Sequence, residues 1–159
     1  MENLILYVED NPDDVILVGL AFRKANSSAH LEFLGDGQRA IDYFVSSPRK
    51  PLPALLILDL KLPKKSGLEV LTWVRKQTTL KRLPVVMFTS SSQPEDIDQA
   101  YDLGANSYLV KPGGIDELVD LVRALDTYWL KANARPGIAF VPVARAVPAL
   151  AKPFPAIQP

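Results

Sequence analysis

The chain has 159 residues, of which 48% are hydrophobic and 23% are charged, as in an ordinary globular domain with a hydrophobic core. It has no cysteine, which excludes a disulfide framework, a thiol nucleophile and a cysteine-ligated zinc site, and which fits a reducing cytoplasm. Its formal net charge is zero, and the lack of a dense basic cluster argues against a nucleic-acid partner.

The hydrophobic pattern also argues against a membrane protein. The first residues lack the basic start and the long apolar stretch of a signal peptide. No apolar run approaches the roughly 18 residues that a membrane span requires. We therefore expect a cytoplasmic protein with neither a nucleic-acid nor a membrane partner.

Short apolar runs alternate with helix-like segments through the first 130 residues. The predicted strands are residues 4–8, 31–34, 54–58, 84–88 and 107–110, and the predicted helices are about residues 12–24, 37–45, 68–76, 94–103 and 115–130. Such alternation favours a doubly wound α/β fold, in which five parallel strands are joined by right-handed crossovers. The strands are almost continuously apolar, as expected when helices cover both faces of the sheet.

Local residues support the helix boundaries. Asn11 can cap the first helix, Pro12 suits its first position, and Asp13 and Asp14 are acidic residues at the positive end of its dipole. We interpret both aspartates as helix-start charges. Gly104 is a plausible stop for the fourth helix.

The composition changes at about residue 134, where proline becomes frequent. We predict one folded domain at residues 1–133 and a Pro-rich C-terminal tail or arm at residues 134–159. Apolar residues such as Ile138 and Phe140 interrupt the tail. The tail is therefore expected either to stay loose or to lie extended along an apolar surface.

Four of the five apolar runs end on a chemically reactive side chain. Glu9 and Asp10 follow the first run, Asp59 the third, Thr89 the fourth and Lys111 the fifth. Because parallel strands end at the same edge of a sheet, these groups should meet at that edge. Open α/β sheets bind ligands there.

The acidic residues of this group suit Mg²⁺, which prefers hard oxygen ligands and keeps several waters. Asp10 and Asp59 would be direct ligands, and Glu9 would act directly or through water. The backbone carbonyl of Lys61 could add another oxygen. A divalent cation would also offset the repulsion among clustered carboxylates.

The same group suits transfer of a phosphoryl group. An aspartate can attack phosphorus and form an acyl phosphate, and Asp59 is the best candidate because it would end a central strand. The transferred group spreads negative charge over its oxygens. Lys111 could neutralise one oxygen as a point charge, and the Thr89 hydroxyl could donate to another.

In this order and spacing, the residues resemble the receiver domain of two-component response regulators. The resemblance covers roughly residues 3–130, and it rests on these motifs: Glu9-Asp10, Asp59, Leu62-Pro63, Ser66-Gly67, Thr89 and Lys111-Pro112. It implies a flavodoxin-like fold with strand order 2-1-3-4-5 and Mg²⁺-dependent phosphorylation of Asp59 by a kinase's phosphohistidine. It also implies a switch formed by Thr89 and Tyr108, and a cis peptide bond before Pro112.

Two further segments, residues 11–14 and 62–67, resemble the single-domain subgroup that partners phytochrome-type histidine kinases. The resemblance implies a sensor histidine kinase as the input partner and an unidentified protein downstream. Because kinases of this class are dimeric and the tail carries apolar residues, we also expect a homodimer.

Two other functions stay open at this point. A Mg²⁺-dependent phosphohydrolase would usually need a substrate-selecting cap or a second acid near the nucleophile, but residues 60–66 are too few for a cap and Lys61 stands where the acid would be expected. A degenerate receiver would bind partners without phosphorylation, which the complete residue set disfavours. We therefore expect a phosphoacceptor signalling protein rather than an enzyme.

Overall fold

A computed structural model describes residues 3–46 and 52–137 of the chain. It contains one sheet of five parallel strands in the order β2-β1-β3-β4-β5. The strands are β1 (Leu4–Val8), β2 (His30–Leu34), β3 (Leu55–Leu58), β4 (Val85–Thr89) and β5 (Ser107–Val110). This is the predicted flavodoxin-like arrangement, and the predicted strand order is confirmed.

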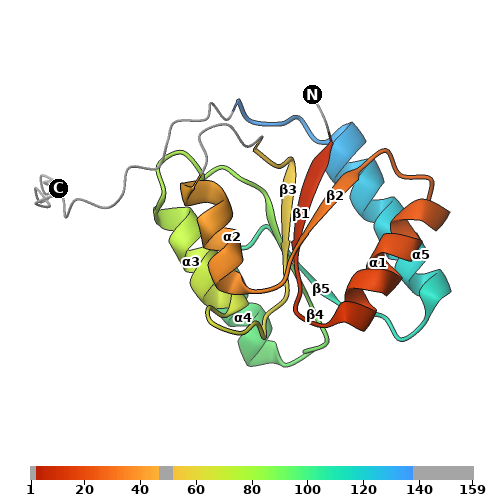
Figure 1. Ribbon diagram of the computed structural model, residues 1–159, viewed down its shortest axis with the longest axis horizontal. Helices are drawn as coiled ribbons and strands as arrows, with labels where there is room; N and C mark the ends of the chain where they lie inside the picture. The colour runs from red at the N-terminus through yellow and green to blue at the C-terminus, as the bar shows by residue number, and fades with distance from the viewer. Residues whose placement is uncertain (1–2, 47–51, 138–159) are drawn as a thin grey trace, which may run out of the picture.

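Helices cover the sheet on both faces, as Figure 1 shows. The helices are α1 (Pro12–Lys24), α2 (Gly37–Val45), α3 (Gly67–Lys76), α4 (Pro94–Asp102) and α5 (Ile115–Leu125), followed by the π-helical segment η1 (Asp126–Ala132). α1 and α5 lie on one face, and α2, α3 and α4 lie toward the other. Within residues 3–46 and 52–137, the structure contains no helix with the length and hydropathy of a membrane span.

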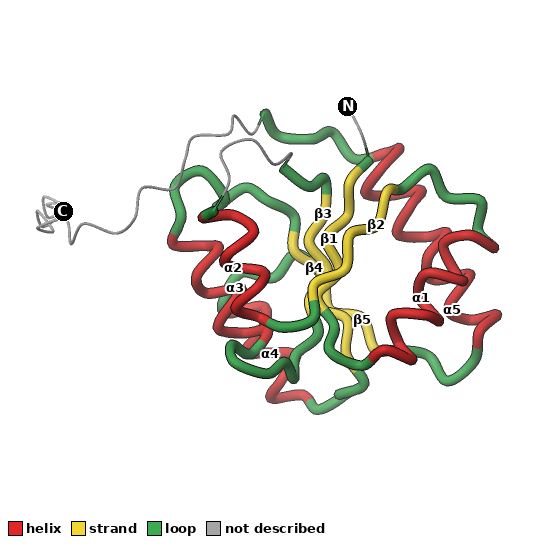
Figure 2. Tube along the Cα trace, in the orientation of Figure 1, coloured by secondary structure: helices red, strands yellow, loops and turns green. Residues whose placement is uncertain are grey.

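Figure 2 shows the sheet as the middle of three layers, and alternate strand residues contribute to two separate cores. In β1, Leu4, Leu6 and Val8 pack on the α2–α3 side, whereas Ile5 and Tyr7 pack on the α1–α5 side. All five residues of this strand are buried. The two-sided burial explains why the strand is apolar at every position rather than at every second one.

The helix ends follow the sequence closely. The side chain of Asn11 accepts a hydrogen bond from the backbone N–H of Asp13 at 2.9 Å, so the predicted cap of α1 is confirmed. Gly104, after α4, has a φ of +99°, a conformation that favours glycine. Ser66 and Glu69 form a reciprocal capping box at the start of α3.

The guanidinium of Arg75 fixes the C-terminal end of α3. It donates to the carbonyl of Gly104 at 2.9 Å, to the carbonyl of Leu83 at 2.8 Å and to the side chain of Asn106 at 2.9 Å. These acceptors stand just before β4 and β5. Arg75 therefore ties α3 to the amino-terminal end of the sheet.

The last helix differs from its prediction. The predicted helix of residues 115–130 is α-helical only to Leu125, and wider π-helical turns continue to Ala132. The first residue of these turns, Asp126, is buried, accepts a hydrogen bond from the Ser27 hydroxyl and pairs with Lys131. Ser27 lies before β2, 99 positions away, so the anchor of this segment leaves no periodic signal in the local sequence. The predicted tail lies outside the described residues from residue 138 onward, and the division at residue 133 stays a prediction.

Asp126 should make the stability of the fold depend on pH. Burial alone would raise the pKa of its carboxyl group, but the contacts with Lys131 and Ser27 outweigh burial and lower the pKa. A folded-state pKa below the unfolded value, about 3.9 for aspartate, gives stability above that pH, and this stability is lost as the pH falls through the folded-state pKa. We expect Asp126→Asn to lower Tm at pH 7 and the difference from wild type to shrink toward pH 3, as measured by circular dichroism. A Tm difference that does not change with pH would contradict this expectation.

Candidate functional site

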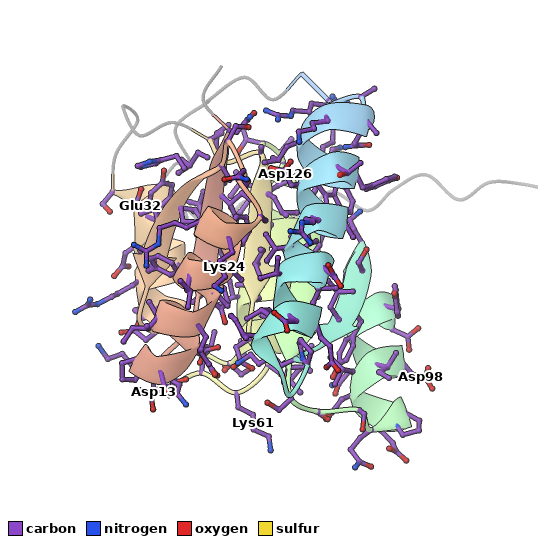
Figure 3. The ribbon with its side chains drawn as sticks, turned by 90° about the vertical axis from the view of Figure 1, so that its right-hand side faces the viewer. Asp13, Lys24, Glu32, Lys61, Asp98 and Asp126 are labelled. Carbon is purple, nitrogen blue, oxygen red and sulfur yellow. The ribbon has the colours of Figure 1, made fainter. Side chains whose placement is uncertain are left out.

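The carboxyl ends of β1, β3, β4 and β5 surround an open hollow of about 540 Å³. Its lining includes every predicted site residue except Tyr108: Glu9, Asp10, Asp59, Lys61, Thr89 and Lys111. In Figure 3 this edge is the lower end of the molecule, marked by Asp13 and Lys61, whereas Asp126 lies toward the opposite end. The sheet thus brings together side chains that are up to about a hundred positions apart in the sequence.

The acidic residues form a compact group. Glu9, Asp10 and Asp59 each offer a carboxylate oxygen, and these three oxygens lie within 4.8 Å of one another. Glu9 and Asp59 are buried, and Asp10 is exposed at the rim. Hard oxygen donors at this spacing, with one side open to water, fit an ion such as Mg²⁺.

Lys111 contacts both buried carboxylates of this group. Its ammonium nitrogen lies 2.6 Å from Oε2 of Glu9 and 2.7 Å from Oδ2 of Asp59, and only 11% of its side chain is exposed. The Nζ atom also lies 5.8 Å from the centre of the Phe88 ring. This placement would let the ammonium meet a charged group attached to Asp59.

The surroundings shift the pKa values of the two buried carboxyl groups, Glu9 and Asp59, in opposite directions. Burial raises the pKa of Glu9. Burial would also raise the pKa of Asp59, but hydrogen bonds with Glu9 and Lys111 outweigh it and lower this pKa. Burial would lower the pKa of Lys111, but its bonds to Asp59, Glu9 and Asp14 raise it above the ordinary value. Asp59 is therefore ionised near neutral pH, as a nucleophile must be.

Asp14 belongs to this site, although the sequence suggests only a helix-start charge. Its Oδ2 accepts a hydrogen bond from Lys111 Nζ at 2.9 Å, and the residue is half-buried. Asp13, its neighbour, is exposed at the start of α1, as predicted. Asp13 and Asp14 are both acidic residues of the first turn of α1, so the local sequence does not distinguish the one that reaches the site.

Thr89 and Tyr108 do not form a hydrogen bond with each other but share Ser91 as a partner. The Thr89 hydroxyl is buried and accepts from the backbone N–H of Ser91 at 3.3 Å. The Tyr108 hydroxyl donates to the Ser91 carbonyl at 3.0 Å. The Ser91 hydroxyl donates in turn to Asp96 of α4. This arrangement connects the predicted switch residues to α4 through one loop residue.

Lys61 and Pro112 complete the predicted set. The Lys61 side chain points away from the body of the protein (Figure 3), and its backbone N–H donates to Oδ1 of Asp59 at 3.4 Å. Its carbonyl as a metal ligand stays a prediction. The structure has no cis peptide bond among the residues that it describes, so the bond before Pro112 is trans and differs from the cis form that the family resemblance implies. The trans form is the one that X-Pro bonds generally favour.

Residues 5–123 match the response regulator receiver domain family. The chain belongs to this family. The match covers the sheet from Ile5 onward and ends within α5, and it includes every residue that lines the site.

Several proteins resemble this receiver domain over most of their own length. The probable methanogenesis regulatory protein FilR2 of Methanothrix harundinacea is 38% identical over 138 residues, which cover 86% of this chain and 89% of FilR2. Response regulator Rcp1 of Synechocystis sp. is 35% identical over 136 residues, which cover 84% of this chain and 92% of Rcp1.

Solved structures agree with the sequence comparisons. The Mn²⁺-bound form of Rcp1 superposes with a TM-score of 0.76 at 34% identity and covers 84% of this chain and 99% of that one. The phosphorylated cyanobacterial phytochrome response regulator RcpA has a TM-score of 0.79 at 33% identity, with coverages of 86% and 99%. This receiver domain is therefore similar, in sequence and in fold, to single-domain phytochrome response regulators.

Proposed function

We propose that this receiver domain accepts a phosphoryl group on Asp59 from the phosphohistidine of a partner histidine kinase, with Mg²⁺ bound at Glu9, Asp10, Asp59 and the Lys61 carbonyl. The observation that carries the proposal is the position of Lys111. Its ammonium nitrogen lies 2.7 Å from Oδ2 of Asp59, at the edge of an acidic group whose carboxylate oxygens suit Mg²⁺. A carboxylate held between a cation site and a lysine is suited to receive a phosphoryl group.

The chain's own residues would perform the transfer. An oxygen of ionised Asp59 attacks phosphorus, a P–O bond forms, the P–N bond to the kinase histidine breaks, and its electron pair returns to the imidazole. Lys111 would move its hydrogen bond from Asp59 to an oxygen of the transferred group. The buried Thr89 hydroxyl can donate to another oxygen. Bound Mg²⁺ would neutralise part of the negative charge on the transferred group.

The output would be a change in protein binding rather than a released product. When the Thr89 hydroxyl turns toward the phosphoryl group, its bond with Ser91 N–H is lost. Ser91 also holds Tyr108 and Asp96, so the change reaches the surface at β5 and α4. A complete population switch needs about 5.5 kcal/mol of differential interaction. A group that brings about −1.5 to −2 charge into a partly dry site can supply energy of this order.

Similarity to Rcp1 and RcpA supports a phytochrome-type histidine kinase as the input partner. The proposal extends to residues 134–159 as an arm outside the receiver domain and to a homodimer in solution. Neither extension is needed for phosphorylation of Asp59. Light scattering on the full chain and on a chain that ends at Asn133 would show whether the arm contributes to a dimer.

The phosphorylation site can be tested with a small phosphodonor. Incubation with acetyl phosphate and Mg²⁺ should add the mass of one phosphoryl group to the intact wild-type protein. Asp59→Asn should show no adduct, because an amide cannot form the acyl phosphate. Asp13→Asn makes the same change at an exposed position of α1 and should keep the adduct.

Each other outcome would favour a different function. Rapid release of inorganic phosphate without a lasting adduct would favour a Mg²⁺-dependent phosphohydrolase. A wild-type protein that neither gains mass nor releases phosphate would favour a degenerate receiver. An adduct that persists in Asp59→Asn would place the acceptor elsewhere.

A further inference from the structure

Tyr7 carries a polar group into an otherwise apolar strand, and the proposed function leaves this group unused. Its side chain has no exposed surface. Its ring lies between those of Phe33 and Phe88, with centroid distances of 5.8 Å and 6.1 Å. Phenylalanine would fill this space with the same ring. The presence of the hydroxyl therefore needs its own explanation, because a buried tyrosine hydroxyl requires a hydrogen-bond partner.

The partner of this hydroxyl is the metal-ligand candidate Glu9. Tyr7 donates to Oε2 of Glu9 at 3.0 Å, and the glutamate is itself only 2% exposed. The backbone N–H of Asn11 donates to the other oxygen, Oε1, at 3.0 Å. The Lys111 ammonium is the third donor, at 2.6 Å from Oε2. Both oxygens of the carboxylate are thus held.

The three donors differ in what cation binding would do to them. The contact with Lys111 joins two opposite charges, and a divalent cation would compete with the ammonium for the same oxygens. Tyr7 and Asn11 are neutral donors, so they can keep their bonds while the charged partner changes. Asn11 donates through its backbone and keeps that N–H whatever its side chain. Tyr7 is therefore the side chain that can hold the plane of the Glu9 carboxylate in both conditions.

We propose that the Tyr7 hydroxyl is a positioning group that holds Glu9 in the orientation for divalent-cation binding, and that it thereby sets the cation affinity of the site. This inference rests on the proposed function, because it takes the acidic group to bind Mg²⁺. Side chains that hydrogen-bond to metal ligands typically contribute about 10–100-fold to metal affinity. Tyr7 lies in the core on the α1–α5 face of the sheet, where solvent cannot replace its hydroxyl.

The test is Tyr7→Phe, which removes one oxygen atom and keeps the ring. Binding of Mn²⁺ is measured by the loss of the free-ion electron paramagnetic resonance signal, and binding of Mg²⁺ by competition with Mn²⁺. We expect the dissociation constants of both ions to rise about tenfold. Tyr101→Phe removes a hydroxyl from an exposed tyrosine of α4 and should leave both constants unchanged. Circular dichroism confirms that each variant is folded.

A double-mutant cycle separates positioning of Glu9 from a general effect on the sheet. In a Glu9→Gln background, Tyr7→Phe should change the Mn²⁺ dissociation constant by less than about twofold, because the partner carboxylate is gone. A tenfold effect that persists in this background would overturn the inference. So would Tyr7→Phe binding Mn²⁺ as tightly as wild type, a result that leaves the proposed function intact. Wild-type protein that binds neither ion would overturn both the inference and the role of Mg²⁺.

Discussion

Lys111→Met is expected to lower the free energy of unfolding by about 3–5 kcal/mol in the absence of divalent cations, because removal of one partner leaves buried charges without compensation. The ammonium contacts Glu9, Asp14 and Asp59 at 2.6, 2.9 and 2.7 Å. The side chain of Glu9 is only 1% exposed, so water cannot replace the lysine there. Urea unfolding with a chelator present measures the loss.

Mg²⁺ should then restore part of the lost stability. A cation that binds only the folded state stabilises it by about 2.7 kcal/mol at a concentration 100 times its dissociation constant. The matched control is Lys61→Met, because the exposed side chain of Lys61 points away from the protein (Figure 3), although the residue lines the same hollow. This control should unfold at nearly the wild-type urea concentration. A loss below about 1 kcal/mol in Lys111→Met would instead match the value of an exposed ion pair.

Gly67→Ala should damage both the stability and the phosphorylation of the protein. A Cβ atom at this position would lie 2.0 Å from the carbonyl oxygen of Asp59 and 3.1 Å from Cα of Leu60. Both are backbone atoms, which cannot turn aside as a side chain can. Forcing extra atoms into a packed interior typically costs about 1–3 kcal/mol, and a backbone clash belongs at the upper end of this range.

The clash involves the backbone of Asp59, the proposed phosphoacceptor. Because a misplacement of about 1 Å can cost roughly 100-fold in rate, we expect phosphorylation by acetyl phosphate to slow at least about tenfold in Gly67→Ala. Gly113→Ala provides the control, since a Cβ there meets nothing within 4 Å although Gly113 is only two residues from Lys111. Urea unfolding and the initial rate of adduct formation give the two readouts. Equal rates in both variants would show that Asp59 does not depend on this close approach.

The sequence predicts the sheet well because two local signals agree. Apolar runs of strand length and caps such as Asn11 mark the same boundaries, and both follow from short-range chemistry. The convergence of Glu9, Asp59 and Lys111 is also predictable, because parallel strands must end at a common edge. The strand order and the switch formed by Thr89 and Tyr108 came from the family resemblance, whereas the other site roles were predicted from the chemistry of the residue types.

Contacts between distant segments could not be predicted in the same way. Asp14 satisfies the rule for a first-turn acid, and this local explanation hides its contact with Lys111, 97 positions away. The hydroxyl of Tyr7 lies within an apolar run and leaves no periodic signal. Ser27 and Asp126 meet only because α1 and α5 pack together. Such pairs depend on tertiary packing, which overrides local preference.

The two helices α3 and α4 are secured very differently. α3 begins at a capping box and ends at the hydrogen bonds of Arg75, so moving it would break a set of polar contacts at both ends. α4 buries only Ala100 and has no side-chain cap. Elements with little buried apolar surface shift or open at a low free energy. We therefore expect a displacement at Ser91 to move α4 more readily than α3.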